Sequence, residues 1–206
     1  MSPEKKEFAL FLKELGLPAE VLKRFEAYHQ LLEEQNRMVN LVSRAEPSEK
    51  WWTKHFLDSL LLLKCLDLTG KKALDFGSGA GLPGIPLKLA VPELRITLLD
   101  SIGKKARALE AMTAELQLDK VHVVNARLED HALQGIGYDL ILCRAVKMEE
   151  RYRHPLYRLL NKGGKVIFYK AIQSSDLDEY QPRLLHSEQY PWGSRSLWEV
   201  ARKALA

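Results

Sequence analysis

The fold class is indicated most clearly by one glycine-rich stretch, Leu74-Asp75-Phe76-Gly77-Ser78-Gly79-Ala80-Gly81-Leu82-Pro83-Gly84. Its first residues complete a short apolar run at 73–76, which predicts a β-strand, and the glycines follow at the carboxyl end of that strand. Glycines 77, 79 and 81 let the backbone turn sharply and lie against a ligand, where any Cβ would collide. We therefore expect this loop to form the floor of a nucleoside site.

The spacing of the loop excludes two common nucleotide-binding motifs. A dinucleotide fingerprint, G-x-G-x-x-G, needs glycine at position 82, where this chain has leucine. A P-loop needs Gly-Lys followed by Ser or Thr, and the loop has no such run. The loop thus favours neither a pyrophosphate nor a triphosphate, and a nicotinamide oxidoreductase is a distant alternative.

From Lys71 onward, short apolar strands alternate with amphipathic helices such as 104–116, the pattern of parallel βαβ units. This pattern predicts an α/β, doubly wound, mostly parallel sheet. After Ala171 we expect a polar, helix-like stretch around 174–185, and then an antiparallel pair at 189–192 and 197–201 that closes the sheet. The five parallel strands are expected at 73–76, 95–99, 121–125, 139–143 and 166–169.

The first 70 residues carry helical patterns instead. Ser2-Pro3 is typical of a helix start, and the apolar spacing that follows ends at Gly16. A second helix is expected from Pro18 and a third from Pro47-Ser48. We expect residues 1–70 to form an N-terminal helical extension packed on a domain of residues 71–206.

Composition limits the cellular setting and the partners. The chain has 206 residues and a net charge of +4, which suits a polyanionic partner but equally an ordinary solvated surface. Cys65 and Cys143 are too few for a disulfide framework, and neither they nor the six histidines have metal-ligand spacing. Without an apolar run of membrane-spanning length, we expect a cytoplasmic protein with no metal and no membrane partner.

The ends of the later strands extend the expected ligand site. Asp100 ends the second strand, where its carboxylate can accept hydrogen bonds from both hydroxyls of a ribose. A sulfonium cofactor, which is positively charged and has no phosphate, suits an acidic rim with Asp75 nearby. The alternative is that the glycines form an ordinary flexible loop and that Asp100 is a strand-end cap.

Two further strand ends are expected at the same edge of the sheet. Adenine should lie near Leu128 and Glu129, with an apolar contact from the leucine. Arg144 would stand at the mouth, where substrate meets the transferred methyl group. Arg127 and Arg144 are equally interpretable as ion-paired scaffold residues.

The motifs resemble those of the glucose-inhibited division protein B family, the bacterial 16S ribosomal RNA guanine-N7 methyltransferases. The resemblance runs from about Phe25 to Lys203 and implies a class I methyltransferase-like (Rossmann-like) fold, S-adenosyl-L-methionine as cofactor, and 16S rRNA of the small ribosomal subunit as substrate. The blocks that carry it are Asn40-Leu41-Val42-Ser43, His55-Phe56-Leu57-Asp58-Ser59, 75–86, 98–105, Arg127-Leu128-Glu129 and Arg144-Ala145. The chain departs from the usual family residues at Cys143, Val146, Ala171 and Ser194.

The resemblance implies cofactor contacts at Gly77, Leu82, Asp100, Leu128, Glu129 and Arg144. In the same loops we also expect contacts from Ser78, Gly79 and Ser101. RNA contacts are expected from basic residues around the mouth, although many of these are equally interpretable as solvated surface charges. The RNA-binding candidates are Lys104, Lys105, Arg107, Arg127, Arg151, Arg153, Arg158, Lys170 and Arg195.

The expected chemistry requires no catalytic acid or base. Guanine N7 has an in-plane lone pair and no proton, so the enzyme chiefly positions its reactants. Cys143 lies in an apolar run and is interpreted as core rather than as a nucleophile. His55 is expected either to contact substrate or to make an ordinary interhelix hydrogen bond.

Two alternatives to this function stay open. One is a methyltransferase of the same fold that acts on another RNA, a protein or a small molecule. The other is a non-catalytic ribosome-binding protein that retains the nucleoside pocket. In neither case is an obligatory protein partner evident from the sequence.

Overall fold

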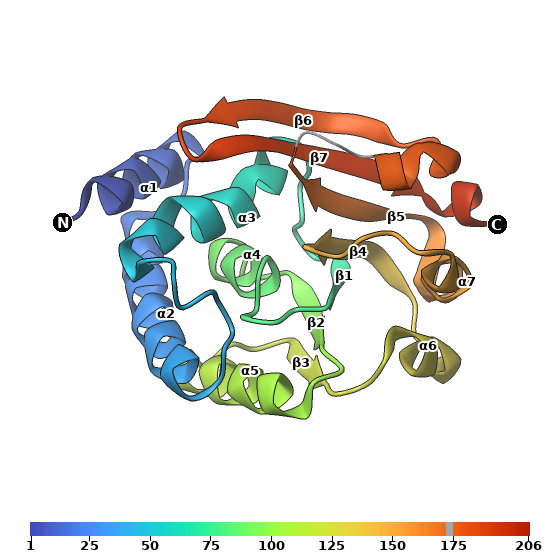
Figure 1. Cartoon of the computed structure of the whole chain (residues 1–206), viewed down its shortest axis with the longest axis horizontal. Helices are drawn as coiled ribbons and strands as arrows, with labels where there is room; N and C mark the ends of the chain where they lie inside the picture. Colours follow the sequence, from blue (N-terminus) through green and yellow to red (C-terminus); the bar gives the residue numbers. More distant parts are fainter. Residues whose placement is uncertain (172–174) are drawn as a thin grey trace.

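The structure is a computed structural model that describes residues 1–171 and 175–206. One seven-stranded sheet has the order β3-β2-β1-β4-β5-β7-β6 and runs through the middle of the molecule (Figure 1). The first five strands are parallel neighbours, and β7 pairs antiparallel with both β5 and β6. The predicted doubly wound, mostly parallel sheet is therefore confirmed. The strands are β1 (Lys72–Phe76), β2 (Arg95–Leu99), β3 (Val121–Val124), β4 (Tyr138–Arg144), β5 (Leu160–Lys170), β6 (Arg183–Tyr190) and β7 (Gly193–Ala201).

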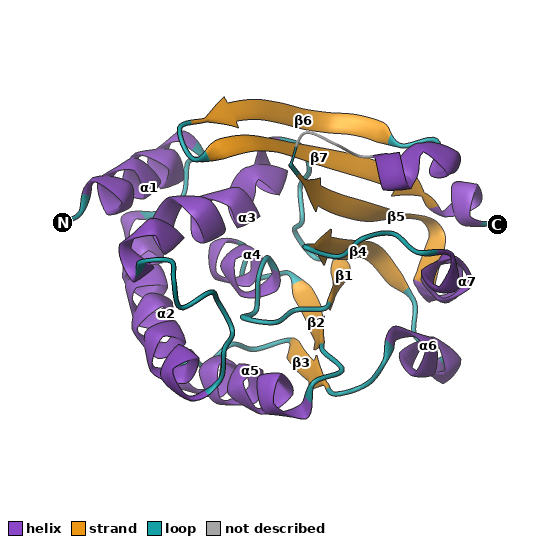
Figure 2. Cartoon of the chain, viewed as in Figure 1, coloured by secondary structure: helices purple, strands orange, loops and turns teal. Residues whose placement is uncertain are grey.

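Helices cover both faces of the sheet (Figure 2). One apolar cluster contains side chains from helices α1 through α5 and from the strands, such as Ile96 and Leu142. A second cluster contains side chains from α6, α7 and the strands, such as Ile141 and Phe168. Alternate residues of β4 enter opposite clusters because successive side chains of a strand point to opposite faces. The helices are α1 (Pro3–Glu14), α2 (Ala19–Met38), α3 (Asp58–Leu60), α4 (Gly84–Ala90), α5 (Gly103–Glu115), α6 (Leu128–His131) and α7 (Glu150–Leu159).

The N-terminal helices begin and end close to the predicted residues. The Ser2 hydroxyl caps α1 by accepting a hydrogen bond from the Lys5 amide at 3.2 Å. The third predicted helix is real but irregular: 3-10 turns flank a π-helical turn at Trp52–Leu57 and the short α3. Its buried residues include three adjacent apolar pairs four or five positions apart, and wide turns keep these pairs on one face. The pairs are Trp51 and Trp52, Phe56 and Leu57, and Leu60 and Leu61.

The C-terminal expectations need correction. The strand expected at 189–192 is instead β6, and Pro191 and Trp192 form the turn into β7. Of the helix-like stretch expected at 174–185, Ser174 lies outside the described residues, Ser175–Tyr180 forms a 3-10 helix, and residues 183–185 belong to β6. Pairing with β7 fixes this strand, and the local pattern does not reveal that partner.

The helical extension forms a continuous core with the sheet. Phe8 of α1 packs edge-on against Phe25 of α2, with ring centroids 4.8 Å apart, and both reach Phe56. These rings belong to the same apolar cluster as Leu82 and Ile85, which follow the glycine loop. The N-terminal helices thereby support the loop. None of the described helices combines the length and the apolar character needed to cross a membrane.

Candidate cofactor and substrate site

The glycine loop connects β1 to α4 at the carboxyl edge of the sheet. Gly77, Gly79 and Gly81 all have positive φ, at 74°, 58° and 88°. A side chain at Gly81 would clash with Ile85, so this glycine permits close packing of α4 rather than contact with a ligand. A side chain at Gly79 would meet nothing nearer than 3.8 Å. Gly81 is therefore not part of the expected ligand floor, for which Gly77 and Gly79 remain as candidates.

Asp75 lies beneath this loop and not on its rim, which corrects the expected acidic rim. Its carboxylate is fully buried, accepts a hydrogen bond from the Ser78 hydroxyl and accepts another from the Gly84 amide at 3.0 Å. Burial raises the pKa of Asp75 to about 6, against the lowering effect of these hydrogen bonds. Asp75 and the side chain of Ser78 thus support the loop from below.

Asp100 at the end of β2 holds the loop from the other side. Its Oδ2 accepts a hydrogen bond from the Gly79 amide at 2.9 Å, and its Oδ1 accepts one from the Ile102 amide at 2.9 Å. Each carboxylate oxygen has two lone pairs, so each keeps one for a further donor. The carboxylate is thus fixed in place and can still accept two hydroxyl hydrogen bonds.

A cavity of about 190 Å³ opens beside Asp100. Five of the predicted cofactor residues line it, namely Gly77, Asp100, Ser101, Leu128 and Glu129. Ser78 and Leu82 are buried away from it, and Gly79 and Arg144 do not line it. The remaining lining residues are Phe76, Leu99, Ala126, Arg127, Arg151 and Tyr152.

Tyr152 is a lining residue that the sequence reasoning missed. Its ring packs edge-on against Phe76, with centroids 5.0 Å apart, and the Arg151 guanidinium lies 4.6 Å from its centroid. Tyr152 is on α7, which follows β4, and the rule that ligands bind beyond strand ends extends to the connections after them. Arg127 and Arg151, expected to bind RNA, lie on this cavity instead.

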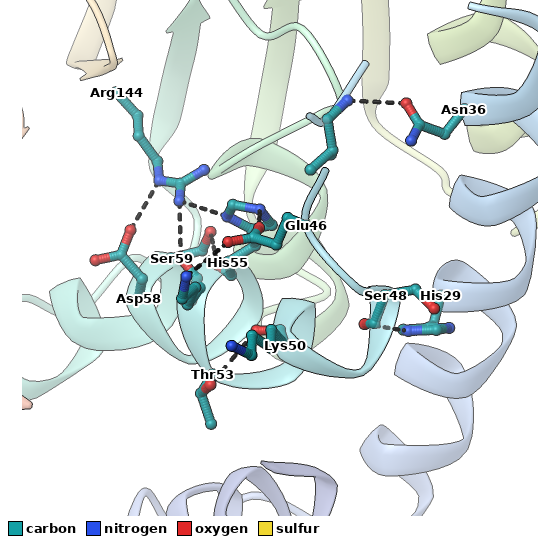
Figure 3. Close-up of polar contacts among 12 residues, drawn as sticks. His29, Asn36, Glu46, Ser48, Lys50, Thr53, His55, Asp58, Ser59 and Arg144 are labelled. Carbon is teal, nitrogen blue, oxygen red and sulfur yellow. Dashed lines mark hydrogen bonds and ion pairs between the residues drawn. The ribbon is translucent and has the colours of Figure 1, made fainter. Parts of the chain in front are cut away.

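Arg144 lies at the end of β4, next to the loop, and is ion-paired. Its Nε donates to Asp58 Oδ2 at 2.8 Å, and its Nη2 donates to the Lys54 carbonyl at 3.0 Å and to His55 Nδ1 at 2.9 Å (Figure 3). Phe76 of β1 pairs with Cys143, so Arg144 stands level with Gly77. His55 thus contacts a strand end, so the expected interhelix hydrogen bond is wrong, whereas the alternative, contact with substrate, stays a prediction.

Several other basic residues that were expected to contact RNA have partners within the chain. Lys170 pairs with Asp176 at 2.6 Å, and Arg195 lies 3.1 Å from Asp58 and over the Trp192 ring. Arg153 donates to the carbonyl of Leu205 at 3.4 Å. In contrast, within 1–171 and 175–206, no ion pair holds Lys104, Lys105, Arg107, Arg127 or Arg158.

Cys143 lies within the second apolar cluster, and its side chain is buried. Burial raises the pKa of the Cys143 thiol far above its usual range, with a further contribution from the charge of Asp75. A thiol in this state is not available as a nucleophile.

The family model of GidB, described as rRNA small subunit methyltransferase G, matches residues 21–190. The chain belongs to this family. Curated relatives named ribosomal RNA small subunit methyltransferase G agree with the match: one from Ligilactobacillus salivarius is 36% identical over 85% of this chain and 76% of its own. Another, from Carboxydothermus hydrogenoformans, is 40% identical over 78% of this chain and 70% of its own.

Solved structures of low sequence identity share the fold of this GidB family chain. A SAM-dependent methyltransferase from Aquifex aeolicus superposes with a TM-score of 0.56 at 14% identity, over 69% of this chain and 89% of its own. A mutant of MtNAS, in complex with S-adenosylmethionine, superposes with a TM-score of 0.58 at 18% identity, over 95% and 83%. The expected class I methyltransferase-like fold is therefore confirmed.

Proposed function

We propose that this chain transfers the methyl group of S-adenosyl-L-methionine to N7 of a guanine in 16S rRNA of the small ribosomal subunit. Family membership supports the reaction class and the RNA. The observation that carries the cofactor assignment is the Asp100 carboxylate, fixed by two backbone amides beside a cavity and still able to accept two ribose hydroxyls.

The residues around the cavity suit the rest of an adenosine. Leu128 offers an apolar contact for adenine, and the rings of Tyr152 and Phe76 line the same cavity. The glycine loop beside the cavity has neither of the two common phosphate-binding motifs, in agreement with a ligand that has no phosphate. When bound, the cofactor supplies a methyl group on a positively charged sulfur, which is a good leaving group.

The chain's own contribution is positioning. N7 needs no base because it carries a lone pair and no proton, so the described residues have to bring donor and acceptor into line and exclude water. The buried thiol of Cys143 and the buried carboxyl of Asp75 take no part in such a transfer. Lys104 and Lys105, exposed or half-buried near the cavity edge, suit RNA phosphates.

The decisive experiment supplies the protein with methyl-labelled S-adenosyl-L-methionine and small subunits from cells that lack it. Label in 7-methylguanosine, found by nucleoside analysis, is the expected result. Label in another nucleoside, in protein or in a small molecule would contradict the proposed acceptor. Binding of S-adenosylhomocysteine without any transfer would favour a ribosome-binding protein that keeps the pocket.

The role of Asp100 has its own test. Asp100→Asn loses the charge and one acceptor oxygen, so we expect the Kd for S-adenosylhomocysteine to rise about tenfold to a hundredfold in calorimetry. Asp178→Asn, at an exposed position remote from the cavity, is the matched control and should bind as the wild type does. If both variants bound S-adenosylhomocysteine with the same Kd, Asp100 would not be part of the cofactor site.

A further inference from the structure

Arg144 is held by the helical extension in a way that leaves one side of its guanidinium free. Nε is taken by Asp58, and both hydrogens of Nη2 are taken by the Lys54 carbonyl and by His55 Nδ1. Nη1 makes no hydrogen bond to the described part of the chain. A guanidinium carries five donors in a planar fork, so fixing three of them fixes the direction of the remaining two.

The contact with His55 defines which nitrogen of that ring is protonated. Arginine can only donate, so His55 Nδ1 must accept, and the ring proton must lie on Nε2. Glu46 Oε2 lies 2.7 Å from Nε2, where a carboxylate favours this tautomer. Burial and the charge of Arg144 lower the pKa of His55 to about 4, which keeps the ring neutral and able to accept.

Glu46 is itself held in place. It pairs with Lys54 at 2.9 Å, on the helical turn that also offers its carbonyl to Arg144 (Figure 3). Asp58 is almost fully buried and lies between Arg144 and Arg195, whose Nε is 3.1 Å away. The carboxylates that pair with Arg144 and with His55 therefore come from Asp58 and Glu46, neither of which lines the cofactor cavity.

The free side of Arg144 belongs to the same edge as the cofactor loop. Phe76 pairs with Cys143, so the residues that follow them, Gly77 and Arg144, lie side by side. In agreement, a Cβ on Gly77 would lie 3.2 Å from Val146. The methionine part of the cofactor carries a carboxylate, and the two free N–H donors of Nη1 can make a charge-assisted hydrogen bond to such a group. The adenosine end is already accounted for by Asp100 at the end of β2, which β1 separates from β4.

We propose that Glu46 and His55 are positioning residues that, together with Asp58, aim Nη1 of Arg144 at the carboxylate of the bound cofactor's methionine moiety. This inference rests on the proposed function. It assigns to the helical extension a part in binding the cofactor, through a histidine whose orientation is set by a glutamate.

The test compares two ligands that differ in the group concerned. S-adenosylhomocysteine keeps the methionine carboxylate, whereas 5′-methylthioadenosine lacks it. In calorimetry, His55→Ala should raise the Kd for S-adenosylhomocysteine about tenfold, because the guanidinium loses a charge-assisted contact, and should leave the Kd for 5′-methylthioadenosine within about twofold. Glu46→Ala should act in the same direction, and its matched control Glu49→Ala, at an exposed position without an ion pair in the described chain, should not.

Two further variants distinguish positioning from loss of stability. His55→Asn keeps an acceptor where Nδ1 lies, so we expect it to restore most of the affinity that His55→Ala loses. In an Arg144→Met background, His55→Ala should weaken binding no further, because its effect passes through Arg144. Thermal unfolding of each variant shows whether it is folded at the temperature of the titration.

The contradicting results are equally defined. Equal weakening of both ligands by His55→Ala, or additive effects in the Arg144→Met background, would overturn the positioning role. A raised KM for RNA with unchanged affinity for S-adenosylhomocysteine would assign Nη1 to RNA and also overturn it. Failure of the wild type to bind either ligand would instead refute the proposed function.

Discussion

At the scale of single residues, Asp75 shows how the site is built on a buried carboxyl. Its pKa is about 6 in the folded chain, against 3.8 for an ordinary aspartate, because burial disfavours the charged form. A raised folded pKa means that the contribution of this group to stability is complete below pH 3.8. That contribution is lost as the pH rises through 6.

Asp75→Asn should remove this pH dependence and keep an acceptor for Ser78 and Gly84. We expect the free energy of unfolding of the wild type, minus that of the variant, to fall by about 3 kcal/mol between pH 3.5 and pH 7.5. Urea unfolding at several pH values measures the difference. A constant difference over this range would show that Asp75 does not titrate there.

At the scale of elements, α2 holds the glycine loop through a residue other than those that Asp100 contacts. The hydroxyl of Tyr28, which is fully buried, donates to the carbonyl of Ala80 at 2.7 Å. This bond joins residues 52 positions apart and connects the helical extension to the ligand loop. A loop with glycines at positive φ gains a fixed conformation from such a contact.

Tyr28→Phe should lower the free energy of unfolding by about 1 to 3 kcal/mol, because the buried carbonyl of Ala80 loses its partner. It should also weaken the binding of S-adenosylhomocysteine, since the loop is less well fixed. Tyr157→Phe is the control, because that hydroxyl makes no hydrogen bond in the described chain. Chemical unfolding and calorimetry on both variants give the answer, and identical results for the two would contradict the role of Tyr28.

At the scale of the whole molecule, only some of the basic residues expected to bind RNA lack an ion pair within the described chain. Lys170 and Arg195 form ion pairs within the chain, and Arg153 donates a hydrogen bond to a backbone carbonyl. Lys104 and Lys105 at the start of α5 have no ion pair in the described chain. Electrostatic attraction for RNA should therefore be concentrated beside the cofactor cavity.

The double variant Lys104→Ala with Lys105→Ala should raise the KM for RNA and flatten its dependence on salt. Each lost phosphate contact lowers the slope of log affinity against log salt by about 0.7 to 0.9. Lys71→Ala with Lys162→Ala, which changes two exposed lysines around a different cavity, is the matched control. A control variant with the same salt dependence as the test variant would argue against a localised RNA surface.

The two predicted parts of the chain share one apolar core, which sets an expectation for the isolated second part. Residues 71–206 alone would expose Leu82 and Ile85, which the described structure covers with Phe8, Tyr28 and Phe56. We expect this fragment to lack a cooperative unfolding transition in circular dichroism, since large apolar surfaces require burial. A cooperative transition would show that it folds on its own.

The parallel strands, the glycine loop and the aspartate at the end of β2 could be predicted from the amino-acid sequence. These follow from local periodicity, from glycine conformations and from the rule that parallel strands end at one edge. Other features are visible only in the tertiary structure. Asp75 lies below the loop, and Tyr152 lines the cavity. Asp58 and His55 contact Arg144, and Glu46 contacts His55. The same holds for β6, whose partner is β7. Contacts between residues far apart in the chain depend on packing and pairing, which local patterns do not encode.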